Sequence, residues 1–341
     1  MPDISLFYNY SKVLSHNCTY NMVIGARGLG KTYGAKKKAI KDCIRTGAQH
    51  IYLRRFDTEL HARSTYFDDL IARNEFPDWD FRINGLVGEM APVATRDEKK
   101  RKWQTVVYFC ALSKAQSYKG MSFATVTLII FDEFIIEVGF TQYIADEARV
   151  FDNFYSTVDR WQDRTRVLFL ANSVSIMNPY FLKYNIVPKE GDEYIFVGDS
   201  FMVIHLAKSD GFASDVLKTK FGKFIAGSDY AEYAVGNSFS DNADTLIADK
   251  TSNALYQYTL QTKRATFSVW YDSNNNFYYI QAKLPKQERR YTIVPSRVDT
   301  DNLLLLHNDR VLQLLRTAYR AARVWSDNPS TRNAFLDIFK R

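Results

Sequence analysis

The sequence predicts an α/β protein in which a parallel sheet is followed by a smaller α+β domain. The segments 125–134 and 166–173 are nearly continuous runs of Val, Ile, Leu and Phe, and residues 20–24 form a third buried-strand pattern. Runs that are apolar on both faces are typical of the middle of a parallel sheet covered by helices. After residue 244 the pattern changes to short strands. A chain of 341 residues is too long for one small core, so two domains are expected.

The elements of the first domain follow from periodicity and from the residues that end each pattern. Gly47 stops the first helix, Pro77 ends the second, and Asn84-Gly85 is a hairpin signal. The last helix is the crossover between the last two strands. Strands are expected at residues 20–24, 50–56, 103–112, 125–134 and 166–173, and helices at 32–44, 58–76 and 144–162.

A stretch punctuated by Gly, Ser and Asp, residues 208–244, is interpreted as a linker with one or two short helices. The predicted boundaries are 1–205 for the first domain, 206–244 for the linker and 245–341 for the second domain. In the second domain, strands are expected at 254–260, 265–271, 276–282 and 291–295, and helices at 305–325 and 330–341.

The composition is that of an ordinary globular protein, with 46% hydrophobic and 24% charged residues. The net charge of +7 suits a polyanionic partner. The three cysteines, Cys18, Cys43 and Cys110, have neither zinc-ligand nor disulfide spacing. No signal peptide is predicted, and the longest apolar segment, 126–136, is interrupted by acids and too short to span a bilayer. A cytosolic, reduced protein with no membrane contact is therefore expected.

The segment after the first strand has the spacing of a phosphate-binding loop, G-x4-G-K-T. Its residues are Gly25, Ala26, Arg27, Gly28, Leu29, Gly30, Lys31 and Thr32. The glycines let backbone N–H groups turn toward a phosphate, and the following helix adds its positive N-terminus. In this pattern the lysine contacts the β- and γ-phosphates, and the threonine hydroxyl is a ligand of Mg²⁺. Since a strand precedes the loop and a helix follows it, we predict a P-loop NTPase domain that binds ATP and Mg²⁺, rather than a simple glycine-rich turn.

A pair of acids, Asp132 and Glu133, ends the buried strand LIIFDEF. One carboxylate of such a pair organises Mg²⁺, and the second polarises or deprotonates the attacking water. The pair therefore indicates hydrolysis, and we expect the ASCE, RecA-like type of P-loop domain. A strand ending in two solvated acids is the alternative.

Further residues are candidates for the same site. Asn172 follows the next strand, where a side chain can sense the γ-phosphate, although an ordinary strand-end turn explains it as well. Hydrolysis motors often take a cation from a neighbouring subunit, an effect of about 10³–10⁵ in rate. Surface ion pairs are the alternative for each candidate, and Arg27 is a candidate within its own subunit. The candidates for the cation from a neighbour are Lys119, Arg160, Arg164 and Arg166.

A basic run next to a predicted turn comprises Lys99, Lys100, Arg101 and Lys102. Such a run either contacts DNA phosphates or is a solvated loop. The sequence has no helix-turn-helix, zinc-finger or RNA-recognition signature. Contact with DNA is therefore expected to involve phosphates rather than base edges.

Together, the blocks SLFYNYSKVLS, VIGARGLGKTY, IYLRRF, FDEF and ANSVSIMNPYFL resemble those of the small DNA-encapsidation (packaging) ATPases of Picovirinae-type short-tailed phages. The blocks cover residues 5–190, and the C-terminal third is similar in layout. The resemblance implies a terminase-like motor in the host cytoplasm: a homo-oligomeric ring, expected to be a pentamer, docked on the portal of a procapsid and threading double-stranded DNA inward. It also implies that Lys31 and Thr32 serve phosphate and Mg²⁺, that Asp132 and Glu133 are the acidic pair, and that Arg160 and Lys119 act in trans.

The second domain departs from that of large terminases, whose RNase H-like nuclease carries acids on its first strand. Here the first strand, 254–260, contains no acid, and Asp272 falls at a hairpin turn. A two-metal site needs clustered carboxylates, so we expect no nuclease activity, in agreement with the vestigial RNase H-like domain that the resemblance implies. In some members of the family this domain grips a structural RNA. The candidate basic patch for such an RNA is Lys283, Lys286, Arg289 and Arg290.

The predicted function is therefore ATP-driven translocation of double-stranded DNA that packages a viral genome into a procapsid. The alternatives are another P-loop ATPase, such as a helicase or a kinase-like enzyme, and a nucleotide-dependent assembly subunit. The acidic pair argues against both the kinase and the passive subunit, and strand separation distinguishes a helicase.

Overall fold

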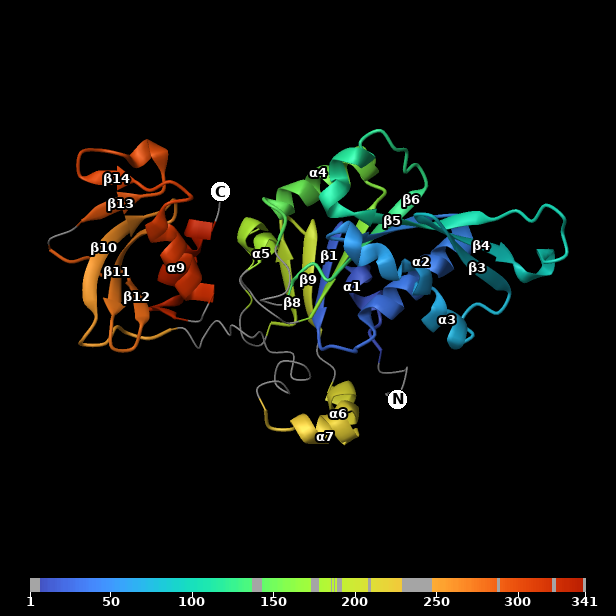
Figure 1. The fold of residues 1–341 in the computed structure, drawn as a ribbon, viewed down its shortest axis with the longest axis horizontal. Coiled ribbons are helices and arrows are strands. Elements are labelled where there is room, and N and C mark those ends of the chain that lie inside the picture. Colours follow the sequence, from blue (N-terminus) through green and yellow to red (C-terminus); the bar gives the residue numbers. More distant parts are fainter. Residues whose placement is uncertain are drawn as a thin grey trace. The chain divides into compact units, whose positions relative to one another are not determined.

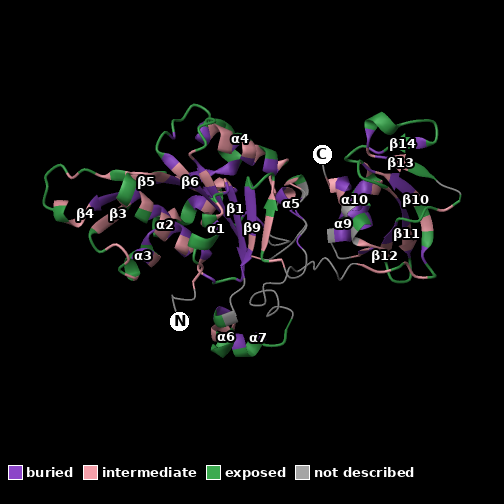
Figure 2. Ribbon diagram, turned by 180° about the vertical axis from the view of Figure 1, so that it is seen from behind, coloured by how far each residue is buried: buried purple, intermediate pink, exposed green. Residues whose placement is uncertain are grey.

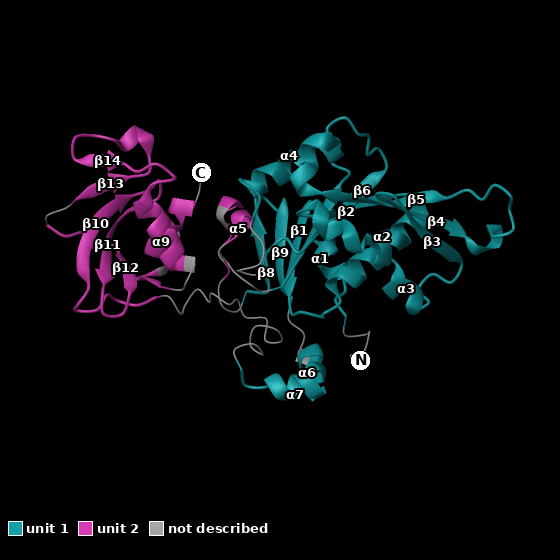
Figure 3. Cartoon of the chain, viewed as in Figure 1, with its two compact units in different colours: residues 1–175, 190–240 teal, residues 176–189, 241–341 magenta. Residues whose placement is uncertain are grey.

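The computed structural model describes residues 7–136, 143–172, 178–184, 186, 188, 192–207, 210–228, 247–286, 289–320 and 323–339. The chain folds into two compact units, which Figure 3 shows in different colours. The first consists of residues 1–175 and 190–240, and the second of residues 176–189 and 241–341. Residues 176–189 thus group with the C-terminal unit, although they precede the predicted end of the first domain. None of the described helices is long and apolar enough to cross a bilayer.

The first unit is built on a nine-stranded sheet. Its strands are β1 Tyr20–Gly25, β2 Gln49–Arg54, β3 Trp79–Asn84, β4 Val87–Pro92, β5 Gln104–Ala111, β6 Val126–Asp132, β7 Arg166–Ala171, β8 Tyr194–Val197 and β9 Met202–Ala207. Their order is β3-β4-β5-β2-β6-β7-β1-β9-β8. Figure 1 shows β8, β9 and β1 side by side at one end of the sheet and the β3–β4 hairpin at the other. The run from β5 to β9 pairs in parallel, and β3, β4 and β8 add antiparallel edges. The predicted parallel core is confirmed, whereas β8 and β9 were not predicted.

The central strands are covered on both faces, as their apolar sequences require. Every residue of β1 is buried, and so is all but one residue of β6 and of β7. Figure 2 shows β1 and β9 as largely buried strands. The helix α2 packs against β2, β6 and β7. The helices in the described part of this unit are α1 Ser11–Ser15, α2 Lys31–Thr46, α3 Asp68–Ala72, α4 Glu147–Asp159, α6 Asp210–Lys218 and α7 Lys220–Ile225.

The prediction of one helix at 58–76 is wrong. The segment forms a 3₁₀ helix, Asp57–Thr65, followed by the short α3. Leu60 from the first piece and Leu70 from the second pack in one core cluster. Two short turns therefore satisfy the same apolar spacing that suggested a single helix, because tertiary packing overrides local periodicity. Other 3₁₀ helices are Val93–Thr95, Leu112–Tyr118, Pro295–Arg297 and Leu336–Phe339.

The second unit contains a six-stranded sheet with the order β14-β13-β10-β11-β12-β15. The strands are β10 Leu255–Gln261, β11 Thr266–Asp272, β12 Phe277–Gln281, β13 Arg290–Thr292, β14 Asn302–Leu304 and β15 Val324–Ser326. An antiparallel meander, β10 to β12, is extended in parallel by β13 and β14 on one side and by β15 on the other. This order agrees with the predicted RNase H-like α+β fold. The α-helices among its described residues are α5 Pro179–Tyr184, α9 Arg310–Arg320 and α10 Pro329–Phe335.

The predicted helix at 305–325 is shorter in the structure. Among the residues of this segment that the structure describes, only those of α9 are helical, and Val324–Ser326 forms β15, which pairs with β12. The periodicity continues into this segment, but pairing with a distant strand decides its conformation.

Candidate active site

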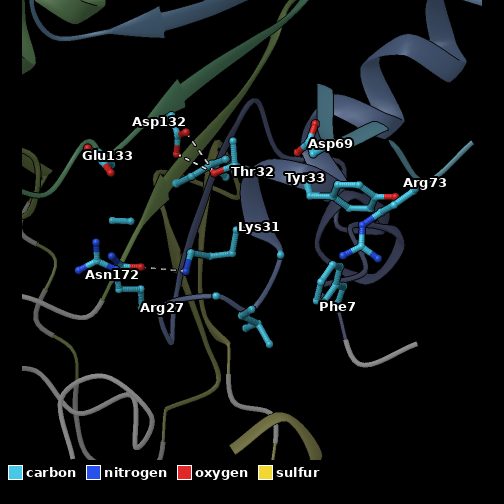
Figure 4. Close-up of a pocket in the computed structure, with 15 residues that line it drawn as sticks. Phe7, Arg27, Lys31, Thr32, Tyr33, Asp69, Arg73, Asp132, Glu133 and Asn172 are labelled. Atoms are coloured by element: carbon cyan, nitrogen blue, oxygen red, sulfur yellow. Dashed lines mark hydrogen bonds between the residues drawn. The ribbon is translucent and has the colours of Figure 1, made fainter. Parts of the chain in front are cut away.

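The phosphate loop, Asn172 and Asp132 lie at the carboxyl ends of three adjacent strands. The loop follows β1, Asn172 follows β7, and Asp132 ends β6. Pairing aligns these ends, since Asp132 lies opposite Leu170 of β7. Open α/β sheets bind ligands at this edge. A pocket of about 380 Å³ opens there, and the structure thus brings the three predicted parts of the site together (Figure 4).

The phosphate loop is shaped by glycines and by the N-terminal segment packed against it. Gly28 and Gly30 have φ of +83° and +76°, a conformation that residues with a Cβ rarely adopt. A Cβ on Gly30 would also lie 2.6 Å from the Cγ of Phe7. The Tyr8 amide donates a hydrogen bond to the Leu29 carbonyl oxygen at 2.9 Å. The N-terminal segment therefore holds the loop from the outside.

Lys31 is folded back onto its own loop. Its Nζ donates to the carbonyl oxygens of Gly25 and Ala26 at 2.8 and 2.9 Å, and to Asn172 Oδ1 at 3.2 Å. Burial lowers the pKa of Lys31 to about 8, and the Asp132 carboxylate opposes this shift. An ammonium group held by neutral oxygens gains a stronger partner when a phosphate arrives.

Asp132 and Thr32 form a pair of hard oxygen ligands. The Thr32 hydroxyl lies 3.1 Å from each carboxylate oxygen, and the Tyr52 hydroxyl donates to Oδ2 at 2.8 Å. Burial raises the pKa of Asp132, whereas Arg54 and these hydrogen bonds lower it. Mg²⁺ is usually held by one or two such side chains together with phosphate oxygens and water, which this pair fits. Across the described ranges, no group of three or more His, Cys, Asp or Glu side chains offers another metal site.

Glu133 lies beside Asp132 and is held by an arginine that was not predicted. It adopts a left-handed conformation with φ of +58°, and its side chain is 63% exposed. Arg54, at the end of β2, donates to Glu133 Oε2 at 2.6 Å and to Glu59 Oε2 at 3.1 Å. Arg54 therefore sets the direction of the Glu133 side chain. Figure 4 shows Glu133 next to Asp132 at the end of its strand.

A buried ion pair, Arg55–Glu147, supports the backbone that carries Glu133. Arg55 Nε and Nη2 donate to the two Glu147 carboxylate oxygens at 2.7 and 3.0 Å. The same guanidinium donates to the carbonyl oxygens of Glu133 at 3.2 Å and of Phe134 at 2.7 Å. A bidentate pair of this kind fixes geometry as well as charge. One feature of the sequence indicates this ion pair. Two arginines stand at the end of the strand IYLRRF, where apolar residues are expected.

The other end of the pocket is lined by aromatic and charged side chains. The Phe7 and Tyr33 rings meet edge to face with centroids 5.6 Å apart, and the Arg73 guanidinium lies 5.4 Å from each ring centre. Asp69, paired with Lys36 at 2.7 Å, completes this end. Figure 4 shows Phe7, Tyr33 and Arg73 together, away from Asn172. These side chains are not required to bind phosphates, but a planar nucleobase can stack on them.

The two cations predicted to act in trans, Lys119 and Arg160, lie at the opposite edge of the sheet. Arg160 directly follows α4 and precedes β7, and its Nη2 donates to the Met121 carbonyl oxygen, in the loop before β6, at 3.0 Å. This edge holds the amino ends of β6 and β7. A strand of seven residues such as β6 separates the two edges by about 20 Å. Neither cation is placed to reach the phosphate loop of its own chain.

The other two candidate cations are used within the fold. The Arg164 guanidinium donates to the carbonyl oxygens of Phe123 and Val158, each at 3.0 Å. Arg166 donates to the Cys18 carbonyl oxygen at 3.1 Å. Both side chains are partly buried, whereas Arg160 is exposed, so these contacts argue against Arg164 and Arg166 as cations that serve a neighbouring subunit.

The predicted DNA-contacting run, residues 99–102, contains one side chain that is used within the fold and three that are exposed. Arg101 pairs with Asp80 at 2.7 Å and donates to the Pro92 carbonyl oxygen at 2.8 Å, which argues against this residue as a DNA ligand. The remaining three side chains are exposed: Lys99, Lys100 and Lys102.

Asp272 of the second unit has a structural role. Its carboxylate accepts hydrogen bonds from the Thr251 hydroxyl at 2.7 Å and from the Asn274 amide at 2.9 Å, and these contacts lower the pKa of Asp272. The carboxylate therefore shapes the hairpin between β11 and β12. The predicted RNA-binding patch is exposed at all four positions, Lys283, Lys286, Arg289 and Arg290.

The fold and the site define a P-loop nucleotide-binding protein with an acidic pair two strands from the loop. Residues 2–341 match the family model of the Podovirus DNA encapsidation protein (Gp16). The chain belongs to this family, and the predicted family and fold class are confirmed.

Relatives and solved structures agree with this assignment. The chain is 33% identical to the DNA packaging protein of Bacillus phage phi29 over 342 residues, which cover 99% of this chain and 98% of the relative. A chain of the bacteriophage Phi-29 viral genome packaging motor assembly is 32% identical with a TM-score of 0.66, over 98% of this chain and 99% of that one. The N-terminal domain of the DNA packaging ATPase from bacteriophage phi29 is 36% identical with a TM-score of 0.53, over 61% of this chain and 99% of that domain.

Proposed function

We propose that this protein is an ATPase that drives double-stranded DNA into a viral procapsid. The observation that supports the proposal best is the pocket in which Lys31, Thr32, Asp132 and Glu133 meet. The pocket itself does not show what the ATP is used for. That its hydrolysis drives DNA packaging is inferred from the DNA encapsidation family and from relatives named DNA packaging protein.

ATP occupies the pocket along its length. The N–H groups of the loop and the N-terminus of α2 bind the β-phosphate. Lys31 exchanges the carbonyl oxygens of Gly25 and Ala26 for oxygens of the β- and γ-phosphates. The adenine base of ATP lies at the far end, where the Phe7 ring and the Arg73 guanidinium provide flat surfaces for it to stack on.

Hydrolysis is prepared by the acids. Thr32 and Asp132 are the ligands for Mg²⁺, which neutralises phosphate charge when bound. Glu133, directed by Arg54, accepts a proton from the water whose oxygen forms a bond to the γ-phosphorus. The bond between the γ-phosphorus and the β,γ-bridging oxygen breaks, and ADP leaves with that oxygen. Asn172, bonded to Lys31 at 3.2 Å, senses whether the γ-phosphate is present.

Assembly completes the site. Lys119 and Arg160 of one subunit act on ATP in the next subunit of a homo-oligomeric ring, which we expect to be a pentamer on the portal. Their position at the edge away from their own loop supports this arrangement. Lys99, Lys100 and Lys102 contact duplex phosphates without reading sequence. The second unit has no nuclease activity, and its basic patch is the place for a structural RNA.

The test is ATP turnover with and without linear duplex DNA, measured alongside the mass of the oligomer in each state. We expect duplex DNA to raise turnover in the assembled ring. A helicase would also separate the strands of a forked substrate, and an assembly subunit would bind ATP without turnover. A protein that is inert toward ATP when procapsid, portal and duplex DNA are all supplied contradicts the proposal.

A further inference from the structure

Trp161 is the most exposed large hydrophobic side chain in the described part of the chain, at 90%. It directly follows Arg160, in the turn that joins α4 to β7. Single exposed apolar residues are common and need no explanation by themselves. The backbone around Trp161, however, is unusual.

The turn holds three residues in the left-handed conformation. Arg160, Trp161 and Asp163 have φ of +53°, +59° and +53°. For a bulky side chain this conformation is an outlier, and it persists only where the surrounding structure fixes it. The fold therefore maintains an unfavourable backbone at the position where Arg160 and Trp161 project outward.

The surroundings of the turn do fix it. The buried Asp159 carboxylate accepts hydrogen bonds at 2.9 to 3.1 Å from four backbone amides, those of Gln162, Asp163, Arg164 and Thr165. The Arg164 side chain then ties the turn to the loop before β6 through the Phe123 carbonyl oxygen. The turn is thus ordered before any partner binds, which lowers the entropy lost on binding.

Positive charge and a second apolar side chain lie beside Trp161. Arg160 Nη2 donates to the carbonyl oxygen of Met121, whose side chain is 41% exposed, and Lys119 is exposed two residues earlier. Among the described residues, neither Arg160 nor Lys119 has a carboxylate at ion-pair distance. We call Lys119, Met121, Arg160 and Trp161 the Trp161 patch.

We propose that the Trp161 patch docks on a second copy of this chain, with Trp161 anchored beside the nucleotide pocket of that copy. This inference rests on the proposed function, because the anchor places Arg160 and Lys119 at the phosphates bound there. Charge complementarity selects the partner: two cations without a carboxylate fit a polyphosphate, and every copy carries one on its phosphate loop when ATP is bound. A contact between two different surfaces of identical chains generates a ring when its rotation closes.

Trp161 acts in this contact as a positioning residue. It brings no charge to the reaction, but tryptophan and arginine are the side chains most enriched at interface hot spots. Truncating such an anchor weakens assembly rather than chemistry. We therefore expect Trp161→Ala to lower turnover at least about tenfold at low protein concentration, with recovery as the concentration rises. Arg160→Ala should show no such recovery.

Mixing two variants tests where the anchor acts. Glu133→Gln chains keep Arg160 but lack the carboxylate that accepts the proton from water. Arg160→Ala chains keep this carboxylate but lack the arginine. Turnover in the mixture requires Arg160 of the first chain at ATP bound to the second. Trp161→Ala placed in the Glu133→Gln chain should reduce this turnover at least about tenfold, whereas the same change in the Arg160→Ala chain should leave most of it. Trp161→Phe in the Glu133→Gln chain should restore most of the loss.

The outcomes separate the two claims. Equal loss from both placements of Trp161→Ala, or no loss from either, overturns the role of Trp161 while leaving the proposed function intact. A mixture with Trp161 intact that shows no turnover at any ratio contradicts the trans-acting role of Arg160, and the docking inference fails with it. ATP affinity of each variant alone, measured in parallel, reports whether its pocket is folded.

Discussion

Two buried charges at the pocket of the first unit and one buried acid of the second unit serve different purposes, although the first unit also contains structural buried charges such as Asp159. In the first unit, Lys31 and Asp132 are buried at the end of the sheet and line a pocket. In the second unit, Asp272 is also buried, but its carboxylate accepts hydrogen bonds from a threonine hydroxyl and from the hairpin backbone. A carboxylate whose hydrogen bonds are met by its own hairpin stabilises structure, whereas a buried cation facing neutral oxygens is prepared for a ligand.

This difference teaches that burial of an acid or a base does not by itself mark a site. What distinguishes a functional group from a structural one is whether it lines a pocket and which groups it contacts. The predictions that follow test the contrast, beginning with the residue on which the first unit depends most.

Lys31→Ala should have the largest effect. It removes the cation that meets the β- and γ-phosphates, so we expect kcat/KM for ATP to fall at least about 10³-fold and calorimetric binding of ATP to be lost. Lys263→Ala, at an exposed lysine of the second unit outside the basic patch, is the matched control and should change neither quantity. Near-normal affinity of Lys31→Ala for ATP would remove the phosphate-loop assignment.

Arg55→Lys should have the next largest effect. Lysine cannot replace the bidentate contact with Glu147 and the two carbonyl contacts that hold the backbone at Glu133. A misplaced base lowers kcat by about 10²-fold with little change in KM. Steady-state kinetics measure both, and Arg82→Lys, at a partly exposed ion pair, is the control. If kcat stays normal while only thermal stability drops, the pair is structural.

Arg73→Ala tests the base end of the pocket. We expect affinity for ATP to fall about tenfold, because the guanidinium beside Phe7 and Tyr33 is lost, while affinity for inorganic triphosphate is unchanged. Competition binding with the two ligands separates the effects. A parallel loss for both ligands would place Arg73 at the phosphates instead.

Asp272→Asn should have the smallest effect on function. The side chain shapes a turn, so a slightly lower unfolding temperature is expected, with ATP turnover unchanged. Incubation of the wild-type protein with supercoiled DNA and Mn²⁺ should leave the DNA intact. Cleavage by the wild type that Asp272→Asn abolishes would make the second unit a nuclease.

Sequence alone predicted the parts of the site that depend on local spacing. The phosphate loop and the acidic pair are contiguous patterns, and the parallel strands that carry them are apolar throughout. Arg54 and Arg55 were not singled out, because their partners are distant in the chain: Glu147 lies 92 residues from Arg55. Contacts between residues distant in the chain also explain why the helices predicted at 58–76 and 305–325 were wrong or too long.

Those segments are controlled by long-range contacts. The 58–76 segment breaks into two short pieces because both pack into one cluster of the core. Val324–Ser326 becomes a strand because β12 offers it an edge. The separate roles of Arg101 and its lysine neighbours also depend on a partner, Asp80, that lies outside the basic run.

The central claim is that Glu133 prepares the water that cleaves ATP held at the end of the sheet. A single-turnover experiment with ATP, Mg²⁺ and duplex DNA tests it most directly by comparing wild type with Glu133→Gln. We predict unchanged ATP affinity and a cleavage rate lower by about 10²–10⁴-fold. Equal cleavage rates in the two proteins would contradict the claim.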